Sequence, residues 1–369
     1  MHPTTIIISV ENFRNNLKAI RHCIPDNVKI CLPVKANAYG HGIKGIAKLA
    51  EDFVDYFAVA CLNEGSFLRN IGIRKPILVL GAIDEDQIPG LIENSLEITV
   101  SSLYKAKLVS DFCNKIGRPC KVHIKIDTGM NRVGIKAKNA HLLIDYVLSE
   151  KNLDLIGVYS HLAESENPDK NYTCLQIESF RQIGCYIKAR SKNIICHLAN
   201  SGAVCYQENS FFDMVRPGIL SYGYFPGEKI ETPPFNQIKP CFTLKTKVAY
   251  FKALEAGESV SYNRSYKTDK LTRIVTLPIG YGDGYRRALS NNGSVIIRGN
   301  KYPITGTICM DMTMSDIGPK GTAYVGDEVI LIGKQGENQI YLEEIAEACQ
   351  TNTYEILCSL SDRIPRYYI

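Results

Sequence analysis

The sequence predicts an α/β fold in which a (β/α)8 barrel of the TIM type is followed by a mostly β domain. First, short apolar runs alternate with helical patterns up to residue 220. Second, long helical patterns then cease and β-type alternation takes over. Third, unusual polar residues fall where the predicted strands end, which is the catalytic face of such a barrel.

Eight strand-like runs are expected to form the barrel. They are 28–35, 56–62, 76–81, 97–102, 120–127, 153–161, 194–201 and 213–220. Most are largely apolar, as buried parallel strands should be. A doubly wound sheet has the same periodicity and is not excluded by it. The barrel is favoured because Lys35, Asp127, His161 and the segments 200–201 and 216–218 lie at or near the carboxyl ends of their strands.

Helices are expected between these strands. In 11–22, Phe13, Leu17 and Ile20 are spaced by four and three residues, which is typical of an amphipathic helix. The clearest of the others are 102–115, 138–149 and 172–190. The last carries an apolar stripe, although Gly184 weakens the helical pattern.

A second domain is expected after a proline-rich linker at 226–240. Strand-like runs at 242–254, 273–280, 293–299 and 327–333 are separated by turn residues, and one helix follows at about 342–350. The predicted division is therefore a barrel over 1–232 and a mostly β domain over 233–369.

Composition limits the functional classes. The chain has 369 residues and a formal charge of +5, with 45% hydrophobic and 22% charged residues, which is the balance of a globular protein. Without a basic run, nucleic acid is not a favoured partner. Thirteen cysteines without a Cys-x-x-Cys pair predict reduced thiols in a cytoplasmic protein. The start lacks the features of a signal peptide, and no apolar run approaches the roughly 18 residues of a membrane span.

Lys35 is the first candidate catalytic residue, because an apolar strand delivers it to a Tyr-Gly-His-Gly turn. A partly desolvated amine at a strand end can form a Schiff base, whereas the simpler interpretation is a lysine that exits into solvent. Loops after strands seven and eight of a barrel often hold phosphate, and here they carry 200–202 and 216–219. For the loop at 216–219, the alternative to phosphate binding is that the chain simply leaves a strand and enters a turn. A phosphate anchor and a Schiff-base lysine on one rim together imply pyridoxal phosphate.

The chain resembles the pyridoxal-phosphate-dependent alanine racemases through ordered motifs along nearly its whole length. They are Pro-Val-Lys-Ala-Asn-Ala-Tyr-Gly-His-Gly at 33–42, Lys-Ile-Asp-Thr-Gly-Met-Asn-Arg-Val-Gly at 125–134, His161, Asn-Ser at 200–201, Val-Arg-Pro-Gly-Ile at 215–219, Val-Ser-Tyr at 260–262, Pro-Ile-Gly-Tyr-Gly-Asp-Gly at 278–284, Ile-Cys-Met-Asp at 308–311 and Tyr-Glu at 354–355. The resemblance implies a homodimer in which both chains build each active site.

The resemblance also implies roles for individual residues. Lys35 would bind the cofactor and act as the base on one face of the substrate Cα, and Tyr262 of the partner subunit would be the base on the other face. A proton must leave one face of a planar carbanion and arrive on the other, which one fixed residue does poorly. His161 and Arg216 would supply the hydrogen-bonded chain that stabilises the tyrosine phenolate.

Arg216 would also face the pyridine nitrogen and, as a donor that does not deprotonate, leave it largely unprotonated. The expected result is a short-lived carbanion and few side reactions. Five further positions match phosphate ligands of the family: Tyr39, Ser201, Gly218, Ile219 and Tyr354.

Substrate recognition is assigned by the same matching to Arg132 and the backbone amide of Met310 from the other chain. A guanidinium fork suits a carboxylate. Lys125 lies where many family members carry a carbamylated lysine that steadies this arginine. Tyr281 matches a residue thought to line the entrance. Asn263 departs from the usual glycine after the tyrosine, and because asparagine tolerates the left-handed region we expect the same turn.

The predicted function is racemisation of L- and D-alanine, supplying D-alanine for peptidoglycan. A racemase of serine or of a broader amino-acid range is a close alternative. A pyridoxal-dependent decarboxylase would have a carboxylate at the pyridine nitrogen, which Arg216 argues against. A non-enzymatic pyridoxal phosphate carrier would not need a β domain, so the predicted β domain argues against this alternative. No metal site is expected.

Overall fold

The computed structural model describes residues 2–369, which divide into two compact units. The barrel unit comprises Asn12–Ala38 and Ile43–Pro240. The C-terminal unit comprises Cys241–Ile369, the short segment Tyr39–Gly42 and the described residues up to Glu11. The division at 232 and 233 drawn from the sequence is linear, whereas in the structure two segments of the first half of the chain join the C-terminal unit.

Eight parallel strands of the described chain close into a barrel, as predicted. Their order is β5-β4-β3-β2-β10-β9-β8-β6, and β5 also pairs with β6 to complete the ring. The strands are β2 (Lys29–Pro33), β3 (Tyr56–Val59), β4 (Ile77–Val79), β5 (Glu97–Val100), β6 (Cys120–Asp127), β8 (Leu153–Tyr159), β9 (Ile195–His197) and β10 (Met214–Val215), with a short β7 (Ile135–Lys136) beside β6. Each predicted strand contains one of the eight, so the doubly wound alternative is wrong.

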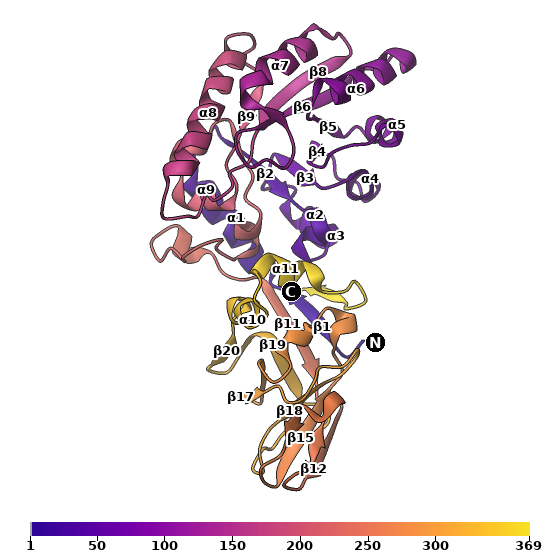
Figure 1. The fold of residues 1–369 in the computed structure, drawn as a ribbon, viewed down its shortest axis with the longest axis vertical. Coiled ribbons are helices and arrows are strands. Elements are labelled where there is room, and N and C mark those ends of the chain that lie inside the picture. Colours follow the sequence, from indigo (N-terminus) through magenta and orange to yellow (C-terminus); the bar gives the residue numbers. More distant parts are fainter. Residues whose placement is uncertain (1) are drawn as a thin grey trace. The chain divides into compact units, whose positions relative to one another are not determined.

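Helices alternate with these strands and lie outside the ring in Figure 1. The bounds are α1 (Val10–Cys23), α3 (Ile43–Ala50), α4 (Leu62–Asn70), α5 (Ile88–Glu93), α6 (Leu103–Ile116), α7 (Ala140–Ser149), α8 (Asn171–Lys188) and α9 (Ser201–Tyr206). The segment labelled α2 (Lys35–Tyr39) is a left-handed turn rather than a regular helix. The four predicted helices correspond to α1, α6, α7 and α8. In α6, the Ser102 side chain caps the N-terminus and Gly117, with φ 64°, closes the C-terminus.

Three short helices, α3, α4 and α5, were not predicted from the pattern. Each carries an internal glycine, which weakens a helical pattern. In two of them packing requires it: a Cβ at Gly65 would lie 2.6 Å from Leu96, and one at Gly90 would lie 2.8 Å from Leu62. Tertiary packing therefore requires glycine at these two positions, although glycine has a low helix propensity.

The C-terminal unit is mostly β, as predicted. Its main sheet has the order β17-β16-β19-β11-β1-β21, with β20 on β19, beside the sheets β12-β15-β18 and β13-β14. The strands are β1 (Thr5–Ile8), β11 (Phe242–Lys247), β12 (Tyr250–Leu254), β13 (Ser259–Val260), β14 (Tyr266–Lys267), β15 (Thr272–Leu277), β16 (Ser294–Ile297), β17 (Asn300–Pro303), β18 (Thr313–Asp316), β19 (Glu328–Gln335), β20 (Asn338–Ile340) and β21 (Arg366–Tyr368), with helices α10 (Leu342–Ala348) and α11 (Thr353–Ser359).

Strand β1 explains why the start of the chain belongs to this unit. It pairs antiparallel with β11 and parallel with β21, and Ile6 and Ile8 are fully buried. In Figure 1 the indigo β1 accordingly runs beside the orange β11. The sheet thus joins residues at both ends of the sequence.

Two further observations concern the chain as a whole. Among residues 2–369, no helix is long and apolar enough to cross a membrane. None of the thirteen cysteines, all of which lie in the described part, forms a disulfide.

Candidate active site

Lys35 follows β2 directly and opens a left-handed turn. The next four residues, Ala36, Asn37, Ala38 and Tyr39, all have φ between 52° and 53°. For residues other than glycine this conformation costs roughly 1–2 kcal/mol each. The surrounding structure must therefore hold the turn in place, as is common at functional sites.

Hydrogen bonds to two polar side chains hold this turn. Glu64 accepts one from the backbone N–H of Ala36 and one from that of Ala60, each at 2.7 Å. Asn37 accepts another from the backbone N–H of Ile43 at 2.7 Å. The Glu64 carboxylate thus links the ends of β2 and β3. Sequence reasoning missed it, because a glutamate early in a helix has no distinctive pattern.

Ser201 links the loops that follow β9 and β10. Its hydroxyl accepts hydrogen bonds from the backbone N–H groups of Gly218, at 2.8 Å, and Leu220, at 3.3 Å. Asn200 caps α9 by accepting from Ala203 N–H at 3.0 Å. Ser201 and Ile219 are buried. The two loops predicted to hold a phosphate therefore lie together, with a hydroxyl and backbone amides as their polar groups.

Arg216 lies in the barrel interior behind these loops and is only 4% exposed. One terminal nitrogen, Nη1, donates to His197 Nδ1 at 2.8 Å. The other, Nη2, donates to the carbonyls of Ser160 and Leu198 at 2.7 and 3.0 Å, and lies 3.4 Å from His161 Nδ1. The structure therefore brings together Arg216 and His161 as predicted.

Lys125 lies in the same interior. Its Nζ donates to the carbonyl of Ile126 at 3.1 Å and lies 5.1 Å from the centre of the Tyr159 ring. Burial is the main cause that lowers the pKa of Lys125 to about 7, and the charges of Arg216 and Arg132 lower it further. A large fraction of this amine is therefore neutral near pH 7.

Arg132 lies on an ordered loop after β6 and is exposed. Asp127, at the end of β6, accepts hydrogen bonds from the backbone N–H groups of Gly129 and Asn131, each at 3.0 Å. Lys136 Nζ lies 3.4 Å from the same carboxylate. Asp127, which the sequence placed at a strand end, thus shapes the loop that presents the guanidinium.

The charges around His161 are all positive. Burial is the main cause that lowers its pKa well below the ordinary value, followed by the charges of Arg216, Lys125, Arg132 and Lys35. His161 is therefore neutral at pH 7. This cationic cluster of Arg216, Arg132, Lys35 and the partly charged Lys125 favours anionic groups such as a phosphate or a carboxylate.

In the C-terminal unit, the predicted phosphate ligands Tyr39 and Tyr354 lie together. Their ring centres are 6.0 Å apart, and Tyr39 is buried. The segment that carries Tyr39 is tied to this unit, because Tyr368 Oη donates to the carbonyl of His41 at 2.9 Å. The left-handed turn after Lys35 therefore ends in a residue that packs in the other unit.

Tyr262 begins the short 3-10 helix η6 (Tyr262–Arg264) and is 68% exposed. Its carbonyl accepts from Thr307 Oγ1 at 3.1 Å. Asn263 has φ 59°, so the expected left-handed turn is confirmed at this position. Asparagine supplies it in place of the usual glycine.

Met310 and Tyr281 lie on two loops that are bonded to each other. The N–H groups of Tyr281 and Gly282 donate to the carbonyls of Cys309 and Met310 at 3.0 and 2.8 Å. A Cβ at Gly280 would lie 2.2 Å from the Cys309 carbonyl, so the close approach requires glycine there. The side chains of Tyr281 and Met310 are 45% and 56% exposed.

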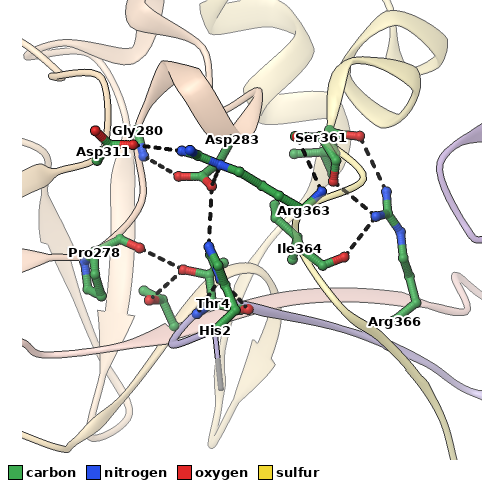
Figure 2. A network of polar contacts seen from close by, with 12 residues as sticks. His2, Thr4, Pro278, Gly280, Asp283, Asp311, Ser361, Arg363, Ile364 and Arg366 are labelled. Atoms are coloured by element: carbon green, nitrogen blue, oxygen red, sulfur yellow. Dashed lines mark hydrogen bonds and ion pairs between the residues drawn. The ribbon is translucent and has the colours of Figure 1, made fainter.

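Arg363 braces these two loops, as Figure 2 shows. Its Nε donates to Asp283 at 2.7 Å and its Nη2 to Asp311 at 2.8 Å. Asp283 is buried and also accepts from the N–H of Gly280 at 2.9 Å. Asp283 is therefore a turn former and in addition half of an ion pair that sequence reasoning missed.

The fold and this geometry define a class of protein. It is a two-domain barrel enzyme with a cationic site at the carboxyl ends of its strands and exposed aromatic and methionine side chains on loops of the β domain.

Comparisons with known proteins make the assignment specific. Residues 8–226 match the alanine racemase N-terminal domain and residues 241–368 the alanine racemase C-terminal domain. The chain is 38% identical to alanine racemase 2 of Caldanaerobacter subterraneus and 40% identical to alanine racemase of Clostridium perfringens, covering all of this chain and 95% and 96% of those relatives. The chain belongs to the alanine racemase family.

Solved structures agree with this. Alanine racemase of Clostridium difficile has a TM-score of 0.93 at 35% identity, over 100% of this chain and 96% of that one. The Bacillus anthracis enzyme, solved with bound L-Ala-P, has a TM-score of 0.92 at 34% identity, over 100% and 95%.

Proposed function

We propose that this enzyme interconverts L- and D-alanine, using pyridoxal phosphate held by Lys35. The observation that carries the proposal is the position of Lys35, directly after β2 and within the cationic cluster around His161, in a chain of the alanine racemase family. Within this proposal, alanine is the expected substrate, and serine or a broader range of amino acids is the alternative.

The residues present fit the cofactor. Ser201 Oγ and the nearby backbone amides of Gly218 and Ile219 would hold the phosphate, together with the hydroxyls of Tyr39 and Tyr354. Support comes from Ser201, which already joins both loops through Gly218 N–H. When bound, pyridoxal phosphate supplies an electron sink that makes the substrate Cα–H acidic.

Lys35 and Tyr262 of the partner subunit act as the two bases in this proposal. One takes a proton from the substrate Cα and the other returns one to the opposite face, so the configuration inverts. The strong exposure of Tyr262 supports its use by another chain. The neutral His161 beside Arg216 can accept a hydrogen bond in the chain that steadies a phenolate.

Arg132 and the backbone N–H of Met310 of the partner subunit bind the substrate carboxylate in this scheme. Arg132 is exposed on the loop after β6, so its guanidinium is accessible to a substrate carboxylate. Carbamylated Lys125 would add a negative charge that steadies it. Tyr281 would line the entrance, since it lies on the loop bonded to the Met310 segment.

Arg216 faces the pyridine nitrogen in this proposal. Because it only donates hydrogen bonds and stays protonated, it does not supply a proton to that nitrogen. Its guanidinium is held by His197 and two backbone carbonyls, which supports a fixed orientation.

The assembly and the cellular role complete the proposal. We infer a homodimer with shared active sites, because Tyr262 and Met310 are exposed on loops of the β domain. The enzyme would act in the cytoplasm, and its D-alanine would be used for cell-wall peptidoglycan.

The test uses absorbance and racemisation assays on purified protein with alanine, serine and lysine. Wild type should bind pyridoxal phosphate with a Schiff-base absorbance band and racemise alanine fastest. Lys35→Ala should lose the band and the activity, whereas Lys44→Ala, which removes an exposed lysine nearby, should keep both. A Lys35→Ala variant that keeps the absorbance band would refute the cofactor assignment. Faster racemisation of serine than of alanine would refute alanine as the preferred substrate.

A further inference from the structure

A line of buried polar side chains crosses the barrel interior from Arg216 to Glu97. Beyond the contact of Arg216 with His197, His197 Nε2 lies 3.1 Å from His123 Nδ1, and His123 Nε2 lies 2.7 Å from Glu97 Oε2. The residues come from the strand ends and interiors of β10, β9, β6 and β5, and none is more than 4% exposed. The line thus joins four strands of the ring.

Arg216 fixes the direction of every hydrogen bond in this line. A guanidinium only donates, so His197 Nδ1 must accept and its single proton lies on Nε2. His197 Nε2–H then donates to His123 Nδ1, which in turn puts the proton of His123 on Nε2. His123 Nε2–H donates to the Glu97 carboxylate. The opposite tautomer at either ring would place N–H against N–H.

The surroundings support a neutral, oriented imidazole at His197. Burial is the main cause that lowers the pKa of His197 well below its ordinary value, and the charge of Arg216 adds to it. Tyr159 stacks on the His197 ring, with centres 4.8 Å apart and planes 11° apart. The Tyr159 hydroxyl is bonded to Thr99 Oγ1 at 2.8 Å, so the stacking ring is itself held.

Glu97 is the last residue of the line. It lines a cavity of about 390 Å³ together with Arg69, Arg118 and Lys121. Because His123 Nε2 carries a proton, the facing oxygen of Glu97 accepts the hydrogen bond. The line therefore begins at a residue that only donates and ends at an accepting oxygen.

We propose that Glu97, His123 and His197 are positioning residues that hold the Arg216 guanidinium in one orientation through this one-way line of hydrogen bonds. The line is not a proton path, because an arginine at its end does not give up a proton. Its effect on catalysis rests on the proposed function, in which Arg216 meets the cofactor. The direction of the hydrogen bonds does not depend on that function.

The first test measures the charge and the tautomer of the two imidazoles directly. Histidine labelled with ¹⁵N in the wild-type holoenzyme at pH 7 should show His123 and His197 as neutral rings with the proton on Nε2, assigned by comparison with His123→Gln and His197→Gln. A cationic ring, or a proton on Nδ1 of either residue, would overturn the proposal whatever reaction the enzyme catalyses.

The second test separates positioning from folding. Glu97→Ala removes the last acceptor and should give mixed tautomers of His123, with kcat lower by roughly tenfold and KM nearly unchanged. Glu97→Gln keeps an acceptor oxygen and should restore the single tautomer and most of kcat. Ser110→Ala, which removes a part-buried hydrogen bond from a buried serine to Glu150, should change neither readout. Equal losses in the Ala and Gln variants, or an unchanged Glu97→Ala, would overturn the proposal.

Discussion

Lys125 shows how its neighbours change the pKa of one side chain. Strand β6 places it in the barrel interior, where burial and two arginines lower its pKa to about 7. A lysine on the outside of the same strand, Lys121, is exposed. The sequence identifies Lys125 only by its position in a motif, because burial and nearby charge depend on residues from other strands.

We predict that carbamylation of Lys125 rises between pH 6 and pH 8 at constant dissolved CO₂. The neutral amine adds CO₂ and releases one proton, and with a pKa of about 7 the neutral fraction grows across this range. Carbon-13 NMR with labelled CO₂ should show a carbamate signal that strengthens with pH and is missing in Lys125→Met. Lys121→Met is the control. A signal that weakens with rising pH, or that survives in Lys125→Met, would contradict the prediction.

We predict that Tyr262→Phe affects the two enantiomers unequally. If Tyr262 serves one face, its loss should slow exchange of the Cα proton by roughly a hundredfold or more for one enantiomer, and much less for the other. Deuterium exchange followed separately from L- and D-alanine measures this. Tyr250→Phe, also at an exposed tyrosine of the β domain, is the control. Equal losses for both enantiomers would remove the one-face role.

At the scale of elements, loops and turns bonded to one another place the candidate residues. The left-handed turn after β2 depends on Glu64 of α4, and the Met310 loop depends on Arg363 near the C-terminus. The sequence predicts the eight barrel strands because each shows its own apolar run. It does not predict these two contacts, because the residues that form them are 28 and 52 positions apart along the chain.

We predict that Arg363→Met raises KM for alanine more than it lowers kcat. The change frees the Asp311 loop and leaves the buried Asp283 without its guanidinium. If the Met310 amide binds the substrate carboxylate, a small displacement of that loop should raise KM by roughly tenfold. Steady-state kinetics with both enantiomers provide the measurement. Arg298→Met, which loses a bridge to Asp327 in the same unit, should leave KM unchanged. A loss confined to kcat would count against this role.

At the scale of the whole molecule, the candidate residues fall into two sets, one in each unit. The barrel unit holds Lys35 and the cationic cluster, and the C-terminal unit holds Tyr262, Tyr281 and Met310. In the proposed homodimer, one chain supplies Lys35 and the cationic cluster to a site, and its partner supplies Tyr262 and Met310.

We predict that two inactive variants complement each other. After Lys35→Ala and Tyr262→Phe protein are mixed, dissociated and reassociated, each mixed dimer has one site with both native residues. Random pairing makes half the dimers mixed, so roughly a quarter of wild-type activity should return. Each variant reassociated alone should stay inactive. No recovery despite mixed dimers, shown by differently tagged chains, would exclude bases from different subunits.

The sequence by itself determined the fold class and the family resemblance and predicted Lys35 as a candidate, because apolar periodicity and local motifs are properties of neighbouring residues. It also predicted the left-handed turn at Asn263. Only the tertiary structure decided that β1 and the Tyr39 segment join the C-terminal unit, that Lys125 is buried beside Arg216, and that two histidines link Arg216 to Glu97. These facts depend on contacts between distant segments, which sheet pairing and barrel closure create.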